Sequence, residues 1–276
     1  MRIAVASGKG GTGKTTVAVS LALAAEKGML IDCDVEAPNS HLFLGPEITE
    51  SSSLQVPVPE LIEEKCNYCG LCRDICRFNA ITVFGETAMI FPEMCHGCGG
   101  CFLACPEEAL KRGSREIGEV EVGQAGQLSF VQGRLRIGEA MAPPLIKEAQ
   151  ARAKGPLVIF DAPPGTSCPM VTCVRAADFT LLVTEPTPFG HHDLKLAVAV
   201  LRQLERPFAV IINKDGLGDE RVAHWCIAEG IDILMRIPFS REAAKGCAAR
   251  QPITEVLPEL GPEFSALLAN LQGEKS

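Results

Sequence analysis

The chain has 276 residues, of which 47% are hydrophobic, and its formal net charge is −8. This apolar content is sufficient for a complete hydrophobic core and argues against a disordered chain. The acidic balance, without a cluster of Lys and Arg, argues against a surface that binds nucleic acid by neutralising phosphates.

Targeting and membrane signals are not evident in the sequence. The first seven residues lead directly into a glycine-rich loop, which leaves no room for the apolar core of a signal peptide. No uninterrupted apolar run is long enough to cross a bilayer, and residues 263–271 lack the basic face of an interfacial membrane helix. We therefore expect a cytoplasmic protein without stable membrane association.

Short apolar runs and helix-like stretches alternate along most of the chain. The runs are rich in Val, Ile and Leu and lack two-residue alternation, as is typical of strands buried on both faces. They cover residues 3–6, 29–31, 157–160, 180–183, 209–212 and 231–237. Helical periodicity covers residues 14–27, 145–154, 193–204, 219–229, 241–250 and 263–271. The alternation predicts an α/β fold, a mostly parallel sheet with helices on both faces.

The loop after the first predicted strand matches a phosphate-binding motif. Residues 8–15 read GKGGTGKT, which satisfies G-x-x-x-x-G-K-[ST] between a strand and a helix. The glycines allow backbone N–H groups to surround phosphate at the positive end of a helix dipole. Lys14 is expected to reach the β- and γ-phosphates of ATP, and Thr15 to hold Mg²⁺.

A second lysine, Lys9, lies inside this loop. The run from Lys9 to Thr15 closely resembles the deviant Walker A motif of the MinD, ParA and nitrogenase iron protein superfamily. Residues 32–39, DCDVEAPN, are similar to the first switch of that superfamily, and residues 161–165, DAPPG, to its second. In the family, the lysine that matches Lys9 reaches across a dimer interface to the partner's nucleotide. The resemblance therefore implies an ATP-dependent homodimer.

Phosphoryl transfer requires a carboxylate to orient water, a metal ion to neutralise charge, and hydrogen-bond donors for the γ-phosphate. By its match to the first switch, Asp34 is the candidate for orienting water, and Asp32 takes either this role or a metal role. Asp161 ends a predicted buried strand and is expected near Mg²⁺, and Gly165 is expected to donate its N–H to the γ-phosphate. The candidate catalytic residues are Lys9, Lys14, Asp34 and Asp161.

Two further segments end predicted strands at the edge where open α/β sheets bind ligands. Asn213 ends the fifth apolar run, and Pro238 and Phe239 end the sixth. The resemblance implies that Asn213 contacts adenine, although an Asn at a strand end is also a common turn former. The candidate nucleotide-binding residues are Gly8, Lys9, Gly10, Gly11, Thr12, Gly13, Lys14, Thr15, Thr16, Asp32, Gly165, Asn213, Pro238 and Phe239.

Eight of the 13 cysteines form two arrays with the same spacing. The arrays are Cys66-x₂-Cys69-x₂-Cys72-x₃-Cys76 and Cys95-x₂-Cys98-x₂-Cys101-x₃-Cys105-Pro106. This is the pattern of bacterial two-cluster ferredoxins, in which the fourth cysteine of each array binds the other cluster. The expected [4Fe–4S] ligand sets are Cys66, Cys69, Cys72 and Cys105 for one cluster and Cys95, Cys98, Cys101 and Cys76 for the other.

The cysteine arrays interrupt the alternation of strands and helices, which predicts a small inserted α+β module. We expect the ferredoxin-like module over residues 58–112, between a first part of the ATPase domain over residues 1–57 and a second part over residues 113–276. Two hairpins are expected, one from residues 80–84 and 88–91 and one from residues 117–122 and 128–137.

Other interpretations of the cysteines stay open. C-x₂-C pairs also bind zinc, and clusters in a small module can be purely structural because metal binding supplies folding energy. The placement of Cys168 resembles that of a cluster ligand in nitrogenase iron proteins, but a second such ligand is not evident. An inert core thiol is therefore the expectation. The same expectation applies to Cys33, Cys173, Cys226 and Cys247.

Together these motifs predict an ATPase that couples nucleotide state or dimerisation to electron transfer through two clusters, with an unidentified redox or cluster-acceptor protein as its partner. One alternative is an iron–sulfur cluster carrier like the Mrp-type relatives, which would need a labile cluster at exposed cysteines. A second is a redox-sensing scaffold or positioning ATPase. A third is a ligase that activates a carboxylate with ATP, although no glutaminase-like domain is evident to supply ammonia.

Overall fold

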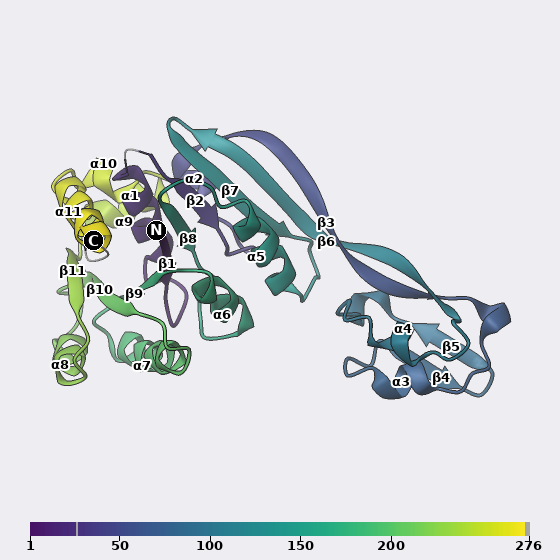
Figure 1. Cartoon of the computed structure of the whole chain (residues 1–276). Helices are drawn as coiled ribbons and strands as arrows, with labels where there is room; N and C mark the ends of the chain where they lie inside the picture. The colour runs from purple at the N-terminus through teal and green to yellow at the C-terminus, as the bar shows by residue number, and fades with distance from the viewer. Residues whose placement is uncertain (26, 274–276) are drawn as a thin grey trace. The chain divides into compact units, whose positions relative to one another are not determined.

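The computed structural model describes residues 1–25 and 27–273. Within these residues the main sheet has nine strands in the order β11-β10-β9-β1-β8-β2-β7-β6-β3 (Figure 1). All neighbouring pairs from β11 to β7 are parallel. The strands are β1 (Arg2–Ala6), β2 (Met29–Asp32), β3 (Glu47–Leu61), β6 (Leu110–Ala125), β7 (Leu128–Leu135), β8 (Val158–Asp161), β9 (Phe179–Thr184), β10 (Phe208–Asp215) and β11 (Ile233–Pro238).

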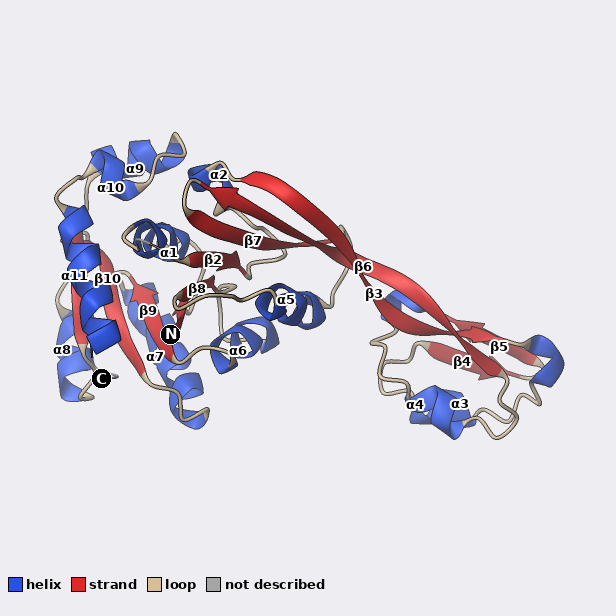
Figure 2. Ribbon diagram, turned by 45° about the horizontal axis from the view of Figure 1, so that its top comes forward, coloured by secondary structure: helices blue, strands red, loops and turns tan. Residues whose placement is uncertain are grey.

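Helices cover both faces of the parallel strands. Helices α1, α9, α10 and α11 lie on one face, and α5, α6, α7 and α8 lie on the other (Figure 2). Their bounds are α1 (Lys14–Leu23), α5 (Ala142–Ala151), α6 (Cys168–Arg175), α7 (Pro188–Gln203), α8 (Arg221–Ala228), α9 (Arg241–Ala248), α10 (Ile253–Val256) and α11 (Leu260–Gly273). Strands β1, β2 and β8 are buried along nearly their whole length, which explains their continuous apolar sequences. The predicted α/β fold is confirmed.

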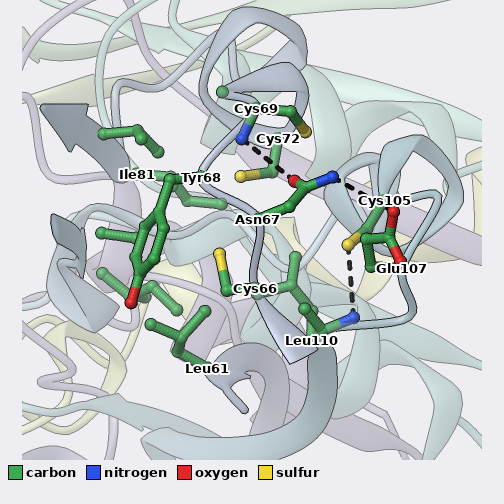
Figure 3. Close-up of a pocket in the computed structure, with 15 residues that line it drawn as sticks. Leu61, Cys66, Asn67, Tyr68, Cys69, Cys72, Ile81, Cys105, Glu107 and Leu110 are labelled. Carbon is green, nitrogen blue, oxygen red and sulfur yellow. Dashed lines mark hydrogen bonds between the residues drawn. The ribbon is translucent and has the colours of Figure 1, made fainter. Parts of the chain in front are cut away.

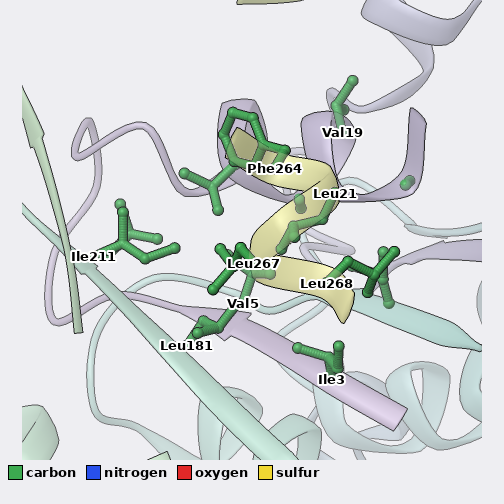
Figure 4. Packing of buried hydrophobic residues seen from close by; sticks show 14 of the residues in the cluster. Ile3, Val5, Val19, Leu21, Leu181, Ile211, Phe264, Leu267 and Leu268 are labelled. Atoms are coloured by element: carbon green, nitrogen blue, oxygen red, sulfur yellow. The ribbon is translucent and has the colours of Figure 1, made fainter. Parts of the chain in front are cut away.

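The core beside the first strand packs α1 and α11 onto the sheet (Figure 4). Leu21 of α1 and Phe264 of α11 are fully buried in one cluster with Ile3 and Val5 of β1. Burial of a side chain of this size stabilises the fold by about 1.5–3 kcal/mol. This packing holds β1 and α1 in place, and therefore fixes both ends of the loop that connects them.

The helices depart from the sequence-based expectation more than the strands do. All six predicted strands are present, whereas α1 ends at Leu23, before the predicted end at residue 27; residue 26 lies outside the described residues. Helices α2 (His41–Leu44), α6 and α10 are not predicted; α2 and α10 have only four residues each, which are too few to display helical periodicity. None of the helices in the described chain has the length and apolarity that a bilayer span requires.

The described chain forms two compact units. The first comprises residues 1–52, 120–134 and 142 onward, and the second comprises residues 53–119 and 135–141. Strands β3 and β6 each contribute residues to both units. Pro57 and Pro59 lie within β3, the last strand in the sheet order, and an edge strand tolerates residues without an N–H donor.

The second unit contains a small antiparallel hairpin and short helices. Strand β4 (Ile81–Phe84) pairs with β5 (Thr87–Ile90), with Ile81 opposite Ile90, as the sequence predicts. Helices α3 (Leu71–Ile75) and α4 (Gly100–Ala104) lie within the two cysteine arrays. The other predicted hairpin corresponds to the adjacent strands β6 and β7, which a turn at residues 126–127 connects.

Candidate functional site

The phosphate loop lies between β1 and α1, as its motif requires. Gly11 and Gly13 have φ angles of +80° and +90°, in the left-handed region that favours glycine. A Cβ atom on Gly13 would lie 2.1 Å from Nδ2 of Asn213, and one on Gly8 would lie 2.2 Å from the carbonyl oxygen of Asp193. The shape of the loop and its close packing therefore both require glycine.

The hollow beside this loop contains residues of the loop and of both predicted switches. Its lining includes Lys14, Thr15, Thr16, Asp34, Asn39 and Pro164. Nζ of Lys14 lies 2.5 Å from Oδ1 of Asp161 and 3.9 Å from Oδ2 of Asp34. Burial acts to lower the pKa of Lys14, but the Asp161 carboxylate and its acidic neighbours outweigh burial and raise this pKa. Lys14 is therefore a buried ammonium that neutralises one carboxylate from each predicted switch.

Asp32, at the end of β2, organises the segment predicted to be the first switch. Its carboxylate accepts hydrogen bonds of 3.0 Å from the backbone N–H groups of Asp34, Asn39 and Ser40. Burial and the nearby Asp161 carboxylate raise the pKa of Asp32 to about 7. The Ser40 hydroxyl also donates to Oδ2 of Asp161 at 3.1 Å. Asp32 therefore shapes the switch loop, and Ser40 connects this loop to the aspartate that ends β8.

Asp34 and Gly165 are the predicted contacts of the attacking water and the γ-phosphate. Burial raises the pKa of Asp34 to about 6, with the Lys14 ammonium acting in the opposite direction. A carboxylate whose pKa lies near neutrality is suited to act as a general base, which accepts a proton from a water molecule. The N–H of Gly165 donates to the carbonyl oxygen of Ser7 at 2.9 Å. A bond from Gly165 to a γ-phosphate therefore requires this N–H to leave Ser7.

A second hollow adjoins the other side of the loop, where the sequence predicts adenine. Its lining includes Gly11, Gly13, Thr16, Asn213, Pro238 and Phe239. Nδ2 of Asn213 donates to the carbonyl oxygen of Thr12 at 2.7 Å, and its Oδ1 accepts from the N–H of Lys214 at 2.9 Å. Asn213 therefore holds the phosphate loop against the end of β10, and the predicted contact with adenine has to be made beside these bonds or in place of them.

The sequence does not identify three residues of this region as candidate site residues: Ser40, Glu185 and Lys214. Glu185 directly follows β9, and its carboxylate lies 2.5 Å from Nζ of Lys9 and 3.0 Å from Nζ of Lys214. Glu185 and Lys214 stand at the carboxyl ends of predicted strands, where parallel sheets gather ligand-binding residues. This position is the signal that could have identified them. Ser40 follows the residues compared with the first switch and offers no signal of its own.

The eight array cysteines line two hollows of the second unit. The first is lined by Cys66, Cys69, Cys72 and Cys105, with Leu61, Ile81, Val83 and Ile90 around them (Figure 3). The second is lined by Cys76, Cys95, Cys98 and Cys101, with Pro57, Phe78 and His96 around them. Each hollow therefore combines three cysteines of one array with the last cysteine of the other.

Backbone N–H groups point toward several of these sulfurs. The N–H of Ala80 donates to Sγ of Cys76, and the N–H of Ala109 donates to Sγ of Cys105, both at 3.3 Å. Burial raises the pKa of Cys101 to about 11. Within the described residues, no three His, Cys, Asp or Glu side chains converge closely enough to hold a single metal ion.

The expectation for Cys168 is wrong. Cys33, Cys173 and Cys226 are buried, as expected of core thiols, and Cys247 is half-buried, but Cys168 is exposed. Cys168 is the first residue of α6, whose buried side includes Met170 and Cys173. It therefore lies off the apolar side of the helix.

Comparison with known proteins supports the fold of the chain and finds relatives over most of its length. The family described as "CobQ/CobB/MinD/ParA nucleotide binding domain" matches residues 3–253. The chain is similar to an uncharacterized protein of Methanocaldococcus jannaschii, with 32% identity over 275 residues, which cover 94% of this chain and 95% of that protein. It is also similar to the septum site-determining protein MinD of Pyrococcus horikoshii in complex with Mg-ADP. The TM-score is 0.59 at 19% identity, with 100% of this chain and 98% of that chain covered, so this likeness concerns the fold.

Two further relatives carry iron–sulfur names. An iron-sulfur cluster carrier protein of Pyrococcus abyssi is 26% identical over 276 residues, which cover 91% of this chain and 78% of the carrier. Ferredoxin-1 of Chlorobaculum tepidum is 36% identical over 58 residues, which cover 19% of this chain and 94% of the ferredoxin. The chain therefore shares a segment of ferredoxin length with one class of protein and nearly its whole length with another.

Proposed function

Because this chain belongs to the CobQ/CobB/MinD/ParA nucleotide-binding family and is a P-loop ATPase, we propose that its nucleotide state and ATP-dependent dimerisation are coupled to electron transfer through two [4Fe–4S] clusters. The observation that carries the proposal is the crossed grouping of eight cysteines around two hollows, in the same chain as the phosphate loop. The partner is a redox protein that exchanges electrons with the clusters, and the compartment is the cytoplasm.

The proposed hydrolysis uses residues that already lie together. Thr15 and Asp161 would hold Mg²⁺, which would neutralise charge on the phosphates. Nζ of Lys14 lies 2.5 Å from Oδ1 of Asp161 and has to leave this carboxylate to reach a nucleotide. Lys14 then turns toward the β- and γ-phosphates, where its charge stabilises the transition state. Asp34 orients the attacking water from the edge of the same hollow. The Gly165 N–H exchanges the carbonyl of Ser7 for a γ-phosphate oxygen.

The residues around the two sulfur-lined hollows fit iron–sulfur clusters. Four thiolates per cluster are the required donor set, and the N–H bonds to Cys76 and Cys105 stabilise negative charge on sulfur. The apolar side chains of Leu61 and Ile81 limit the access of water to the first hollow. Bound clusters would supply one-electron transfer at a potential that these hydrogen bonds and this burial tune.

We assign the cluster-binding module to residues 58–112, inserted between the parts of the ATPase domain over residues 1–57 and 113–276. The arrays and the β4–β5 hairpin fall within this range. The match to nearly a whole ferredoxin over 58 residues supports a module of this size. A homodimer in which Lys9 contacts the nucleotide of the second copy completes the proposal.

A second candidate function is the delivery of whole clusters to acceptor proteins. The similarity over 276 residues to an iron-sulfur cluster carrier protein favours it. The two functions differ in what leaves the protein, since a carrier releases iron and sulfide and an electron carrier keeps both. A redox-sensing scaffold would also keep its iron and sulfide, but its clusters would pass no electrons to a partner and would only change the state of the ATPase.

The test is anaerobic purification with cluster reconstitution, followed by elemental analysis. We expect about eight iron atoms per chain, because eight thiolates serve two four-iron clusters, and broad visible absorption that bleaches on reduction. Incubation with an apo-ferredoxin and ATP then separates the candidates. Retained iron with reversible reduction supports electron transfer, and iron moving to the acceptor supports the carrier. Zinc alone, without visible absorption, would refute the cluster assignment.

A further inference from the structure

The lysine that distinguishes this phosphate loop, Lys9, is held by a carboxylate of its own chain. Nζ of Lys9 lies 2.5 Å from Oε1 of Glu185, a residue 176 positions away in the sequence. The Lys9 side chain is 28% exposed and that of Glu185 is 11% exposed, so the contact is shielded from solvent on one side. A half-buried ion pair of this geometry is worth more than a surface pair. Lys9 therefore has a defined position in the isolated chain.

Glu185 is itself fixed by the turn that leads into α7. The N–H of Thr187 donates to the Glu185 carbonyl oxygen at 2.8 Å, and the Thr187 hydroxyl donates to Oε1 at 3.2 Å. A Cβ atom on Gly190 would lie 2.2 Å from the carbonyl oxygen of Glu185, so the start of α7 closes tightly over this residue. Burial acts to raise the pKa of Glu185, but the two lysines outweigh burial and lower it. The carboxylate is therefore ionised and held in place.

A second cation allows Glu185 to release Lys9 without becoming an unpaired buried charge. Nζ of Lys214 lies 3.0 Å from Oε2 of Glu185 and 2.8 Å from the carbonyl oxygen of Gly11. Removing one partner from a buried pair normally costs several kcal/mol, because the other charge stays behind uncompensated. Here Lys214 remains with Glu185 when Lys9 leaves. The arrangement suits a lysine that exchanges partners.

We propose that Glu185 is a positioning residue that holds Lys9 within its own protomer until the triphosphate of a second copy competes for the lysine. This inference rests on the proposed homodimer in which Lys9 acts on the partner's nucleotide. The γ-phosphate gives ATP more negative charge than ADP. The ATP of the second copy therefore attracts Lys9 strongly enough to replace Glu185 as its partner, whereas ADP does not. Glu185 therefore sets how strongly dimerisation discriminates between the two nucleotides.

The test compares Glu185→Gln with its parent by sedimentation velocity over a range of ATP and ADP concentrations. Asp34→Ala is the parent background, because it slows hydrolysis and preserves the ATP state. Gln keeps the size of Glu but loses the charge, so we expect half-maximal dimerisation at about fivefold lower ATP and detectable dimer with ADP. Glu220→Gln, which disrupts an exposed pair with Arg236, is the matched control and should leave both curves unchanged.

Combination with Lys9→Ala shows whether Glu185 acts through the lysine. We expect Lys9→Ala to stay monomeric with ATP and Glu185→Gln to add nothing in that background. An ATP requirement for Glu185→Gln that is equal to or higher than that of the parent would overturn the inference, as would an effect that persists without Lys9. If Lys9→Ala alone dimerises like its parent, the proposed action of Lys9 on the second copy fails first. Lys214 contacts both Glu185 and the phosphate loop, so Glu185→Gln could also weaken nucleotide binding within one protomer. Calorimetric measurement of the nucleotide affinity of each monomeric variant separates this effect from an effect on dimerisation.

Discussion

Asp34 has a raised pKa in the nucleotide-free protein, which makes its contribution to stability dependent on pH. Burial moves this pKa from 3.8 to about 6. The folded chain therefore binds the proton more tightly than the unfolded chain between these values. The free energy of unfolding contributed by Asp34 accordingly falls as the pH rises from about 4 to about 6. Above pH 6 the contribution is a constant penalty.

The variant Asp34→Asn should remove this dependence, because the amide does not ionise. Relative to the natural protein, its free energy of unfolding should rise by about 2 kcal/mol between pH 4 and pH 7. Urea unfolding at pH 4, 5.5 and 7 in the presence of a chelator measures the difference. Glu47→Gln, at an exposed position, is the control. Parallel stability curves for Asp34→Asn and the natural protein would contradict the assigned burial of Asp34.

At the scale of single residues, the sequence is informative where a motif fixes local spacing. The motifs identify Lys14, Asp34 and Asp161, and these side chains lie together in the structure. Glu185 belongs to no motif, and its contact with Lys9 depends on the pairing of β9 with β1. Strand order is a property of the whole sheet, so local sequence patterns do not predict it.

Among the elements, the strands of the parallel sheet are predictable because burial on both faces imposes continuous apolar runs. The long strands β3 and β6 are not identified at their full length. Their exposed positions carry polar residues, and β3 contains Pro57 and Pro59, which normally indicate a break. The cysteine spacing, by contrast, correctly predicts which four sulfurs line each hollow, because the crossed grouping belongs to the two-cluster ferredoxin pattern.

Strand β6 carries an ion pair that stabilises the second unit. Arg115 pairs with Glu139, and both side chains are more than nine-tenths buried. The guanidinium of Arg115 also donates to the carbonyl oxygen of Cys95 at 3.2 Å. Burial acts to raise the pKa of Glu139, but the hydrogen bond and charge of Arg115 and the backbone N–H groups of Ala140 and Met141 together outweigh burial and lower it. The stabilisation is therefore present above the ordinary pKa of a glutamate and is lost as the pH falls through the lowered value.

The variant Glu139→Gln should destabilise this unit by about 3 kcal/mol at pH 7, because it leaves a buried arginine without its counter-charge. Chemical unfolding followed through cluster absorption reports on the unit that contains the cysteines. Glu60→Gln is the matched control, since it removes only an exposed pair with Lys111 and should cost less than about 1 kcal/mol. Equal effects of the two variants would mean that the buried pair contributes no more than a surface pair.

For the whole molecule, the path of the chain connects the predicted first switch to the cysteine arrays. Asp32 accepts hydrogen bonds from Asn39 and Ser40, α2 begins at the next residue, His41, and β3 begins at Glu47. Strand β3 then leads from the first unit into the second, and β6 leads back. A switch that rearranges around a γ-phosphate therefore acts on the first residues of a strand that the second unit shares.

If this connection transmits free energy, the cluster potentials should differ between ADP and a non-hydrolysable ATP analogue. Thermodynamic linkage then requires that cluster reduction change nucleotide affinity by the same free energy. A shift of about 59 mV corresponds to a tenfold change in a one-electron equilibrium. Redox titration followed by electron paramagnetic resonance measures the potentials, and calorimetry on oxidised and reduced protein measures the affinities. Asp34→Ala with ATP should reproduce the potential of the analogue state.

Two variants identify the route of this coupling. Lys14→Ala should abolish nucleotide binding and therefore any nucleotide-dependent shift in potential. Insertion of two glycines between Leu44 and Gly45 lengthens the segment between the first switch and β3, so we expect it to preserve iron content and ATP binding while reducing the shift. An unreduced shift would mean that coupling follows another path through the molecule. Equal potentials in every nucleotide state, with affinity indifferent to reduction, would make the cluster module a passenger and favour a scaffold function.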